Sequence, residues 1–152
     1  MSQSPTFLSL NDKPALLGLS SPDWQGAALQ ALDELGYKVH QAATHGDFIA
    51  SFTQAPYQVV VIEERFACDD PGENRSLAYL QNLQMHLRRH CVIVLVGDSF
   101  TSFHALEAFQ CGVHLVVNRS ELSLLGQFIQ KVVAENDLFY QPFREAQRRA
   151  IA

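Results

Sequence analysis

"YQVVVIEERF", residues 57–66, is the stretch that decides the fold. Four apolar residues run together from Val59 to Ile62, and three of them are valines. Such a run is typical of a strand that is covered on both faces of a parallel sheet. Glu63 and Glu64 follow directly, so we expect acidic side chains at the carboxyl end of a buried strand. Ligands of open parallel sheets bind at these ends, which makes both glutamates candidate site residues.

Similar apolar runs alternate with helix-like segments along the rest of the chain. Strands are expected at 15–20, 37–42, 57–64, 91–97 and 113–118. Helices are expected between Ser21, an N-cap followed by proline, and Gly36, and then at 44–55, 75–90, 99–112 and 120–136. Right-handed crossovers between parallel strands place helices on both faces of the sheet. The pattern therefore predicts an α/β fold of three layers (α/β/α), with a doubly wound parallel sheet in strand order 2-1-3-4-5.

The composition indicates a single globular domain, since 47% of the 152 residues are hydrophobic and 18% are charged. The net charge of −5 disfavours a nucleic-acid partner, which usually needs a basic surface. No apolar stretch reaches the ~18 residues that a membrane span needs, and no signal peptide is visible. The three cysteines, Cys68, Cys91 and Cys111, are widely spaced and fit a reducing compartment. We therefore expect a cytoplasmic protein with neither a nucleic-acid nor a membrane partner.

The sequence lacks the common enzyme and cofactor motifs. It has no GxGxxG fingerprint, no phosphate-binding P-loop and no GxSxG elbow. His86, His90 and Cys91 could meet at a helix end, but a zinc site wants three or four ligands with supporting hydrogen bonds. We expect no metal, no cofactor and no enzymatic activity. One alternative stays open, because "LSSPDW" (19–24) is faintly like the phosphate loop of a flavin-binding or other small-molecule-binding protein.

Three stretches carry a resemblance to a known family: "DELGYKVHQAATHGDFIASFTQAPYQVVVIEE" (33–64), "CVIVLVG" (91–97) and "CGVHLVVNR" (111–119). Together they resemble the receiver (CheY-like) domains of response regulators. The resemblance covers 14–136, with a tail at 1–13 and a C-terminal extension at 137–152. It implies a flavodoxin-like (βα)5 fold and a part in bacterial two-component signal transduction.

The residues that define a phosphorylated receiver differ in this chain. Receivers of the usual kind carry two acids after strand 1, a phosphoacceptor Asp after strand 3, a Thr or Ser after strand 4 and a Lys after strand 5. The matching positions here are Leu19 and Ser20 (or Ser20 and Ser21), then Glu63, Gly97 and Arg119. A shift of one residue would exchange Glu63 and Glu64. A degenerate site is therefore predicted at Ser20, Ser21, Glu63, Glu64, Gly97 and Arg119.

Each difference weakens the receiver chemistry. Serines at the acid positions remove the negative charge that would attract Mg²⁺. Glu63 is longer than Asp by one methylene, which moves its carboxylate ~1 Å outward, and phosphoryl transfer depends on placement at that scale. We hypothesise that Glu63 and Arg119 form an ion pair instead. The alternative is an atypical receiver that still binds Mg²⁺ or a phosphoryl group through Glu63, Asp69 or Asp70.

The resemblance also implies where protein partners bind. Receivers signal through the face that here would hold Ser102, His104, Glu107, His114, Val116 and Lys131. Val116 stands where switching receivers carry an aromatic, and a valine is stiff at χ1. These features predict a pseudo-receiver, a signalling or adaptor domain that acts by protein–protein interaction without phosphorylation.

The C-terminal extension carries a second candidate contact surface. Leu138, Phe139, Tyr140 and Phe143 form an aromatic and apolar cluster there. Such a cluster packs back on its own domain, which we favour, or on another chain, so that a homodimer is a further prediction. Pro142 is expected to begin a separate short basic helix at 143–150.

Overall fold

The computed structural model describes residues 13–68 and 73–151. Its elements are β1 (Pro14–Gly18), α1 (Pro22–Glu34), β2 (Lys38–Gln41), α2 (His45–Gln54), β3 (Val59–Glu63), α3 (Arg75–Gln81), α4 (Met85–Arg88), β4 (Val92–Gly97), α5 (Ala105–Cys111), β5 (Leu115–Asn118), the 3-10 helix η2 (Arg119–Leu124) and α6 (Leu125–Ile151).

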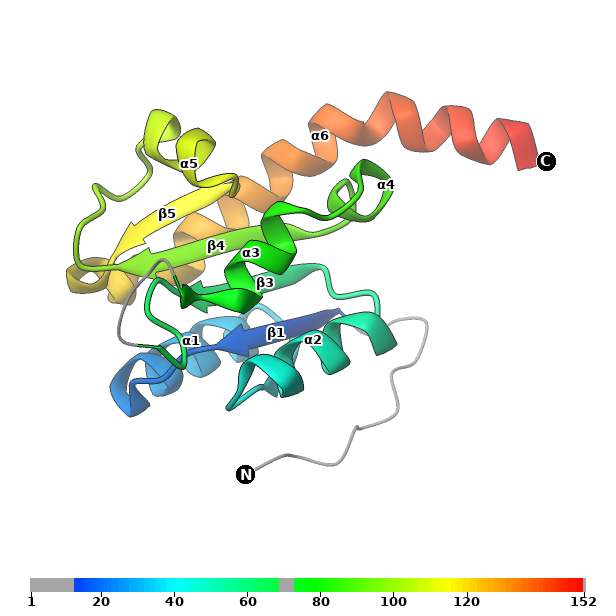
Figure 1. Cartoon of the computed structure of the whole chain (residues 1–152). Helices are drawn as coiled ribbons and strands as arrows, with labels where there is room; N and C mark the ends of the chain where they lie inside the picture. The colour runs from blue at the N-terminus through cyan, green and yellow to red at the C-terminus, as the bar shows by residue number, and fades with distance from the viewer. Residues whose placement is uncertain (1–12, 69–72, 152) are drawn as a thin grey trace.

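The five strands form one parallel sheet in the order β2-β1-β3-β4-β5, which confirms the predicted fold (Figure 1). The stretch that ends in Glu63 is the central strand. Its residue Val61 pairs with Leu17 of β1 on one side and with Val94 of β4 on the other. Because all strands are parallel, their carboxyl ends share one edge of the sheet, and the predicted site residues lie at those ends or just after them.

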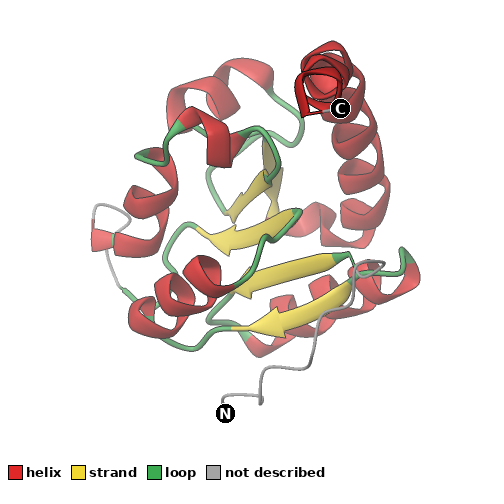
Figure 2. Cartoon of the chain, turned by 90° about the vertical axis from the view of Figure 1, so that its right-hand side faces the viewer, coloured by secondary structure: helices red, strands yellow, loops and turns green. Residues whose placement is uncertain are grey.

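Alternating residues of the strands fill two separate cores, one on each face of the sheet (Figure 2). On β3, Val59 and Val61 pack toward α1 and α6, while Val60 and Ile62 pack toward α2 and α3. All four side chains are fully buried. This burial on both faces explains the unbroken apolar run, since a strand with one solvent-exposed face would alternate apolar and polar residues.

Two predicted helices are shorter than the apolar patterns indicate. The helix expected at 75–90 is interrupted after Gln81, because the side chain of Asn82 donates a hydrogen bond to the carbonyl of Ala78 (2.7 Å) and ends α3. The helix expected at 99–112 begins only at Ala105, where His104 is the N-cap and accepts a hydrogen bond from the backbone N–H of Glu107. Residues 98–104 form a loop instead.

The helix predicted after Pro142 is not a separate element. α6 runs from Leu125 to Ile151 with Pro142 inside it, and its last part extends away from the rest of the fold (Figure 1). Arg144 and Asp137 are joined across the proline by an ion pair of 2.8 Å, which helps to keep the two halves in line. The helix expected at 120–136 begins late, because residues 119–124 form η2.

Candidate functional site

The carboxylate of Glu63 lies over the start of α1. Its Oε1 atom accepts hydrogen bonds from the backbone N–H groups of Ser20 (3.0 Å) and Ser21 (3.3 Å). Ser21 is the N-cap of α1 and makes no capping hydrogen bond with its own side chain. The positive end of the helix dipole lies at this point and favours a negative group. Glu63 therefore places a carboxylate against the N-terminal end of α1, between the carboxyl ends of β1 and β3.

The loop after β3 is tied to the loop after β1. The hydroxyl oxygen of Ser20 accepts a hydrogen bond from the N–H of Ala67 at 2.9 Å, and Ala67 takes a left-handed backbone conformation with φ of 52°. The side-chain amide of Asn74, which is buried, donates to the carbonyl oxygens of Glu63 (2.9 Å) and Glu64 (3.1 Å). These bonds fix the backbone that carries both glutamates.

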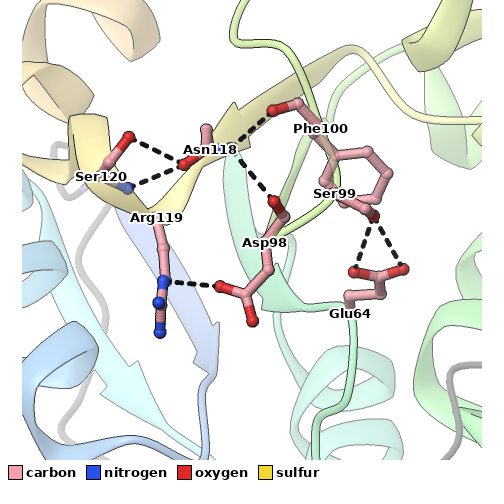
Figure 3. Close-up of polar contacts among 7 residues, drawn as sticks. All are labelled: Glu64, Asp98, Ser99, Phe100, Asn118, Arg119 and Ser120. Atoms are coloured by element: carbon pink, nitrogen blue, oxygen red, sulfur yellow. Dashed lines mark hydrogen bonds and ion pairs between the residues drawn. The ribbon is translucent and has the colours of Figure 1, made fainter.

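Gly97 lies at the end of β4, where a larger residue would force its neighbours to move. A Cβ atom built on Gly97 would lie 2.5 Å from Oε2 of Glu64 and 2.8 Å from the ring of Phe100. Both Glu64 carboxylate oxygens lie 3.4 Å from the hydroxyl of Ser99, toward which the side chain points in Figure 3. Glu64 and Phe100 thus occupy the space where a serine or threonine side chain would begin.

Arg119 binds an acid other than the predicted one. Its Nε atom lies 2.7 Å from Oδ1 of Asp98, the residue that follows β4 (Figure 3). The predicted ion pair between Glu63 and Arg119 is not formed between these two described residues, because each has a different partner. Since both Arg119 and Asp98 are exposed, their pair contributes only about 0–1 kcal/mol to stability. Its effect is to hold the end of β5 against the loop after β4.

Asn118, the last residue of β5, also binds the loop after β4. Its side-chain amide donates hydrogen bonds to the carbonyl oxygens of Asp98 (3.2 Å) and Phe100 (2.8 Å), as Figure 3 shows. Its backbone N–H donates to the hydroxyl of Ser102 at 2.8 Å. Phe103 has a left-handed backbone with φ of 64°, and its N–H bonds to the carbonyl of Val116. The loop between β4 and α5 is therefore anchored at several points to β5.

A cavity of about 1030 Å³ opens beside Glu63. It is lined by Ser20, His45, Glu63, Arg65, Ala67, Cys68, Glu73 and Arg75. His45 is buried, and its Nδ1 atom accepts a hydrogen bond from the backbone N–H of Ser76 at 3.2 Å. Burial, and then the charge of Arg75, lowers the pKa of His45 from its ordinary value. The cavity wall thus combines a neutral imidazole with two guanidinium groups and two carboxylates.

The described residues offer neither a metal-binding cluster nor a membrane-spanning helix. Within 13–68 and 73–151, no group of three or more His, Cys, Asp and Glu side chains could hold a metal ion. Asp69 and Asp70, two of the three candidate ligands in the Mg²⁺ alternative, lie outside the described residues. No helix in the described part of the chain is long and apolar enough to cross a lipid bilayer.

The residues of the predicted partner face do not all lie at the surface. Val116 is fully buried in β5, and the ring of His114 turns toward β4, where its Nδ1 atom accepts a hydrogen bond from the N–H of Ile93 at 3.0 Å. Val116 is therefore not available at the surface, which corrects the prediction for it, whereas His114 is half-buried. The other four, Ser102, His104, Glu107 and Lys131, are exposed or half-buried.

The C-terminal cluster is divided between two sides of α6. Leu138 is 72% exposed and Phe139 is 76% exposed, whereas Tyr140 is half-buried. The ring of Phe143 lies under the guanidinium group of Arg89, 4.0 Å from its centroid. Phe143 therefore packs back on the domain as expected, while Leu138 and Phe139 do not.

Four residues with roles at this edge were missed in the sequence: Asn74, Asp98, Ser99 and Asn118. Asp98 directly follows the strand at 91–97, so the rule that identified Arg119 could have found it. Asn118 and Ser99 also stand at strand ends, but neither is charged, and nothing in the sequence distinguishes them from ordinary loop residues. Asn74 precedes a helix pattern and could have been recognised as an N-cap.

Removing the Glu63 carboxylate is expected to destabilise the chain. We expect Glu63→Ala to lower the free energy of unfolding by about 1–2 kcal/mol, because two backbone N–H groups at the start of α1 lose their acceptor. Glu64→Ala is the matched control, since its bonds to Ser99 are long, and we expect a loss of about 0.5 kcal/mol or less. Urea unfolding followed by circular dichroism measures both. Equal losses in the two variants would contradict the role given to Glu63.

Comparison with known proteins agrees with the fold. No family model matches the sequence, and no curated protein matches it significantly. Among solved structures, a response regulator from Thermotoga maritima is similar over 81% of this chain and 98% of its own, with a TM-score of 0.63 and 11% identity. The chemotaxis response regulator CheY4 of Vibrio cholerae matches over 80% and 99%, with a TM-score of 0.61 and 15% identity. A CheY-like receiver domain protein from Methanospirillum hungatei JF-1 matches over 84% and 98%, with a TM-score of 0.64 and 16% identity.

Proposed function

We propose that this chain is a pseudo-receiver, a signalling or adaptor domain of bacterial two-component type that acts through protein–protein interaction and without phosphorylation. The proposal includes a cytoplasmic location, no enzymatic activity and no bound cofactor. One observation carries it: the carboxylate of Glu63 is already bound by the N–H groups of Ser20 and Ser21. A phosphoryl group on this residue would have to break those bonds, and it would find Ser20 and Ser21 after β1 in place of the acids that hold Mg²⁺ in receivers.

The switching part of a receiver is also engaged in fixed contacts. The loop after β4 is held by Arg119 through Asp98 and by three hydrogen bonds from Asn118. At the strand-5 position where switching receivers carry an aromatic, Val116 is buried and stiff at χ1. A ligand shifts a two-state equilibrium only by its difference in affinity for the two states. These contacts support a domain with one constitutive conformation.

A constitutive domain of this kind would act by presenting a fixed surface. On α5, Leu106 is 58% exposed and Phe109 is 82% exposed, one turn apart on the same side of the helix. Two polar residues of the predicted partner face are close by. Glu107 lies on α5 and is half-buried, and His104 directly precedes α5 and is exposed. We propose that a protein partner binds here, with Phe109 as the apolar anchor, because large exposed aromatics mark contact sites.

An amide NMR titration with Mg²⁺ and then with beryllofluoride, a mimic of a phosphoryl group, tests the proposal. We expect the resonances of Ser20, Glu63, Gly97 and Arg119 to stay in place, apart from shifts that NaCl of equal ionic strength also produces. A phosphorylatable receiver in the same buffer serves as the positive control for the reagent. Saturable shifts at these four residues would show a working acceptor site, and the proposal would then be wrong.

A second candidate function is the binding of a small anionic ligand in the cavity next to Glu63. The observation that favours it is the pair of guanidinium groups, Arg65 and Arg75, in the lining of a cavity of about 1030 Å³, which is at the upper end of the usual size for ligand sites. The same spectra, titrated with FMN and with inorganic phosphate, test it. Saturable shifts at Arg65, Arg75 and His45 that are absent in an Arg65→Ala/Arg75→Ala variant would favour this function.

A further inference from the structure

The outward side of α6 carries one continuous stripe. Six residues recur at spacings of three, four and seven, which places them on one side of the helix. They are Glu135, Leu138, Phe139, Pro142, Ala146 and Arg149, and all six are exposed. We call this set the α6 stripe. Its apolar part is large, since both Leu138 and Phe139 are more than two-thirds exposed.

The charges of the α6 stripe stand at its two ends. Glu135 lies seven residues before Pro142, and Arg149 lies seven residues after it. Each is therefore about 10 Å from the proline along the helix axis. Neither Glu135 nor Arg149 takes part in an ion pair with any residue of the described chain. The stripe is thus acidic at one end, basic at the other and apolar between them.

This arrangement is complementary to itself when two helices run in opposite directions. With a two-fold axis beside Pro142, Glu135 of each copy faces Arg149 of the other. Leu138 then faces Ala146 of the second copy, so a large side chain meets a small one and the helices can approach closely. In a parallel pair each charge would face its own kind, which is unfavourable. We infer that two copies of this chain associate through the α6 stripe as an antiparallel, isologous dimer.

α6 is held in place for such a contact. The carbonyl oxygen of Arg89 accepts hydrogen bonds from the side chains of Asn136 (3.5 Å) and Arg144 (3.2 Å), on the side of the helix that faces the domain. The guanidinium group of Arg89 covers the ring of Phe143. Figure 1 shows the end of α6 projecting past the sheet, where a second copy has access to it. A rigid, projecting helix loses little conformational freedom on pairing, which favours association.

The interface is small, because each copy contributes one stripe of four turns. Interfaces of that kind fall at the low end of the size range, so we expect a dissociation constant on the order of 10–100 μM. Sedimentation equilibrium of the full chain, at concentrations below and above this range, is the first measurement. Leu138→Glu is expected to weaken association at least ~10-fold. Phe109→Glu on α5 alters an equally exposed apolar residue and is expected to leave the dimer unchanged.

Charge exchange tests the direction of the helices. Glu135→Arg and Arg149→Glu, made singly, are each expected to weaken association ~3–10-fold, because each breaks both symmetric ion pairs. The double variant restores opposite charges, and its dissociation constant is expected to lie within ~2-fold of the wild-type value.

This inference goes beyond the proposed function and stands whether or not Glu63 accepts a phosphoryl group. A monomer at every concentration would overturn it and leave the stripe to a different protein. A dimer that is insensitive to Leu138→Glu, or one that the double variant fails to restore, would also overturn it.

Discussion

Phe66→Ala is expected to lower the free energy of unfolding by about 3–5 kcal/mol, the usual cost of removing a buried aromatic ring. Phe66 is fully buried although it belongs to the loop after β3 and to no regular element. Its ring packs against Phe48 of α2 (5.9 Å between centroids) and makes a T-shaped contact with the ring of His45 (5.3 Å between centroids). The truncation would leave a cavity beneath the loop that begins at Glu64, directly after β3.

Urea unfolding, followed through the fluorescence of Trp24, the one tryptophan of the chain, measures this loss. Phe109→Ala is the matched control, since the same ring is removed from a side chain that is 82% exposed, and we expect a change within about 0.5 kcal/mol. Phe66→Leu fills much of the cavity and is expected to recover more than half of the loss. If Phe66→Ala cost no more than Phe109→Ala, the loop would not be anchored by its ring.

The sheet could be predicted from the sequence because each strand carries its own signal. The apolar runs of β3 and β4 are unbroken, since both faces are covered, and crossover helices between parallel strands leave few arrangements. Helix boundaries were harder, because single side chains decide them. Asn82 ends α3 by bonding to its own last turn, and the loop before α5 is fixed by Asn118, which is distant in sequence. Neither contact has a local pattern.

The sequence allowed the placement of Glu63 and Arg119 at strand ends to be predicted, but not the groups that they bind. Glu63 ends β3 and Arg119 directly follows β5, yet β4 lies between those strands. Neighbouring strands are about 4.8 Å apart, so the two residues begin nearly 10 Å from each other. Asp98 follows β4, next to β5, and is therefore the nearer acid for Arg119. Glu63 turns toward β1, its other neighbour, where two free N–H groups are available. The predicted strand order is correct, and it already implies that Asp98 lies nearer to Arg119 than Glu63 does.

Acid is expected to destabilise the domain through His114. Burial, followed by the charge of Arg88, lowers the pKa of this imidazole to about 4 in the folded chain, against an ordinary value of about 6.5 after unfolding. Its Nδ1 atom accepts a hydrogen bond from the N–H of Ile93, so protonation would also break a contact between β4 and β5. The unfolded chain therefore binds the proton more tightly. The stability contributed by neutral His114 is complete above pH 6.5, falls as the pH is lowered and is lost below pH 4, a total of roughly 3 kcal/mol.

His114→Gln separates this effect from all other titrations. Glutamine keeps an acceptor for the N–H of Ile93 but takes up no proton, so we expect the fall in unfolding free energy between pH 6.5 and pH 4 to be about 3 kcal/mol smaller than in the wild type. Carboxylates and the remaining histidines titrate in both proteins and cancel in the difference. Parallel curves for wild type and His114→Gln would mean that His114 is protonated without cost, and that its ring does not hold β4 and β5 together.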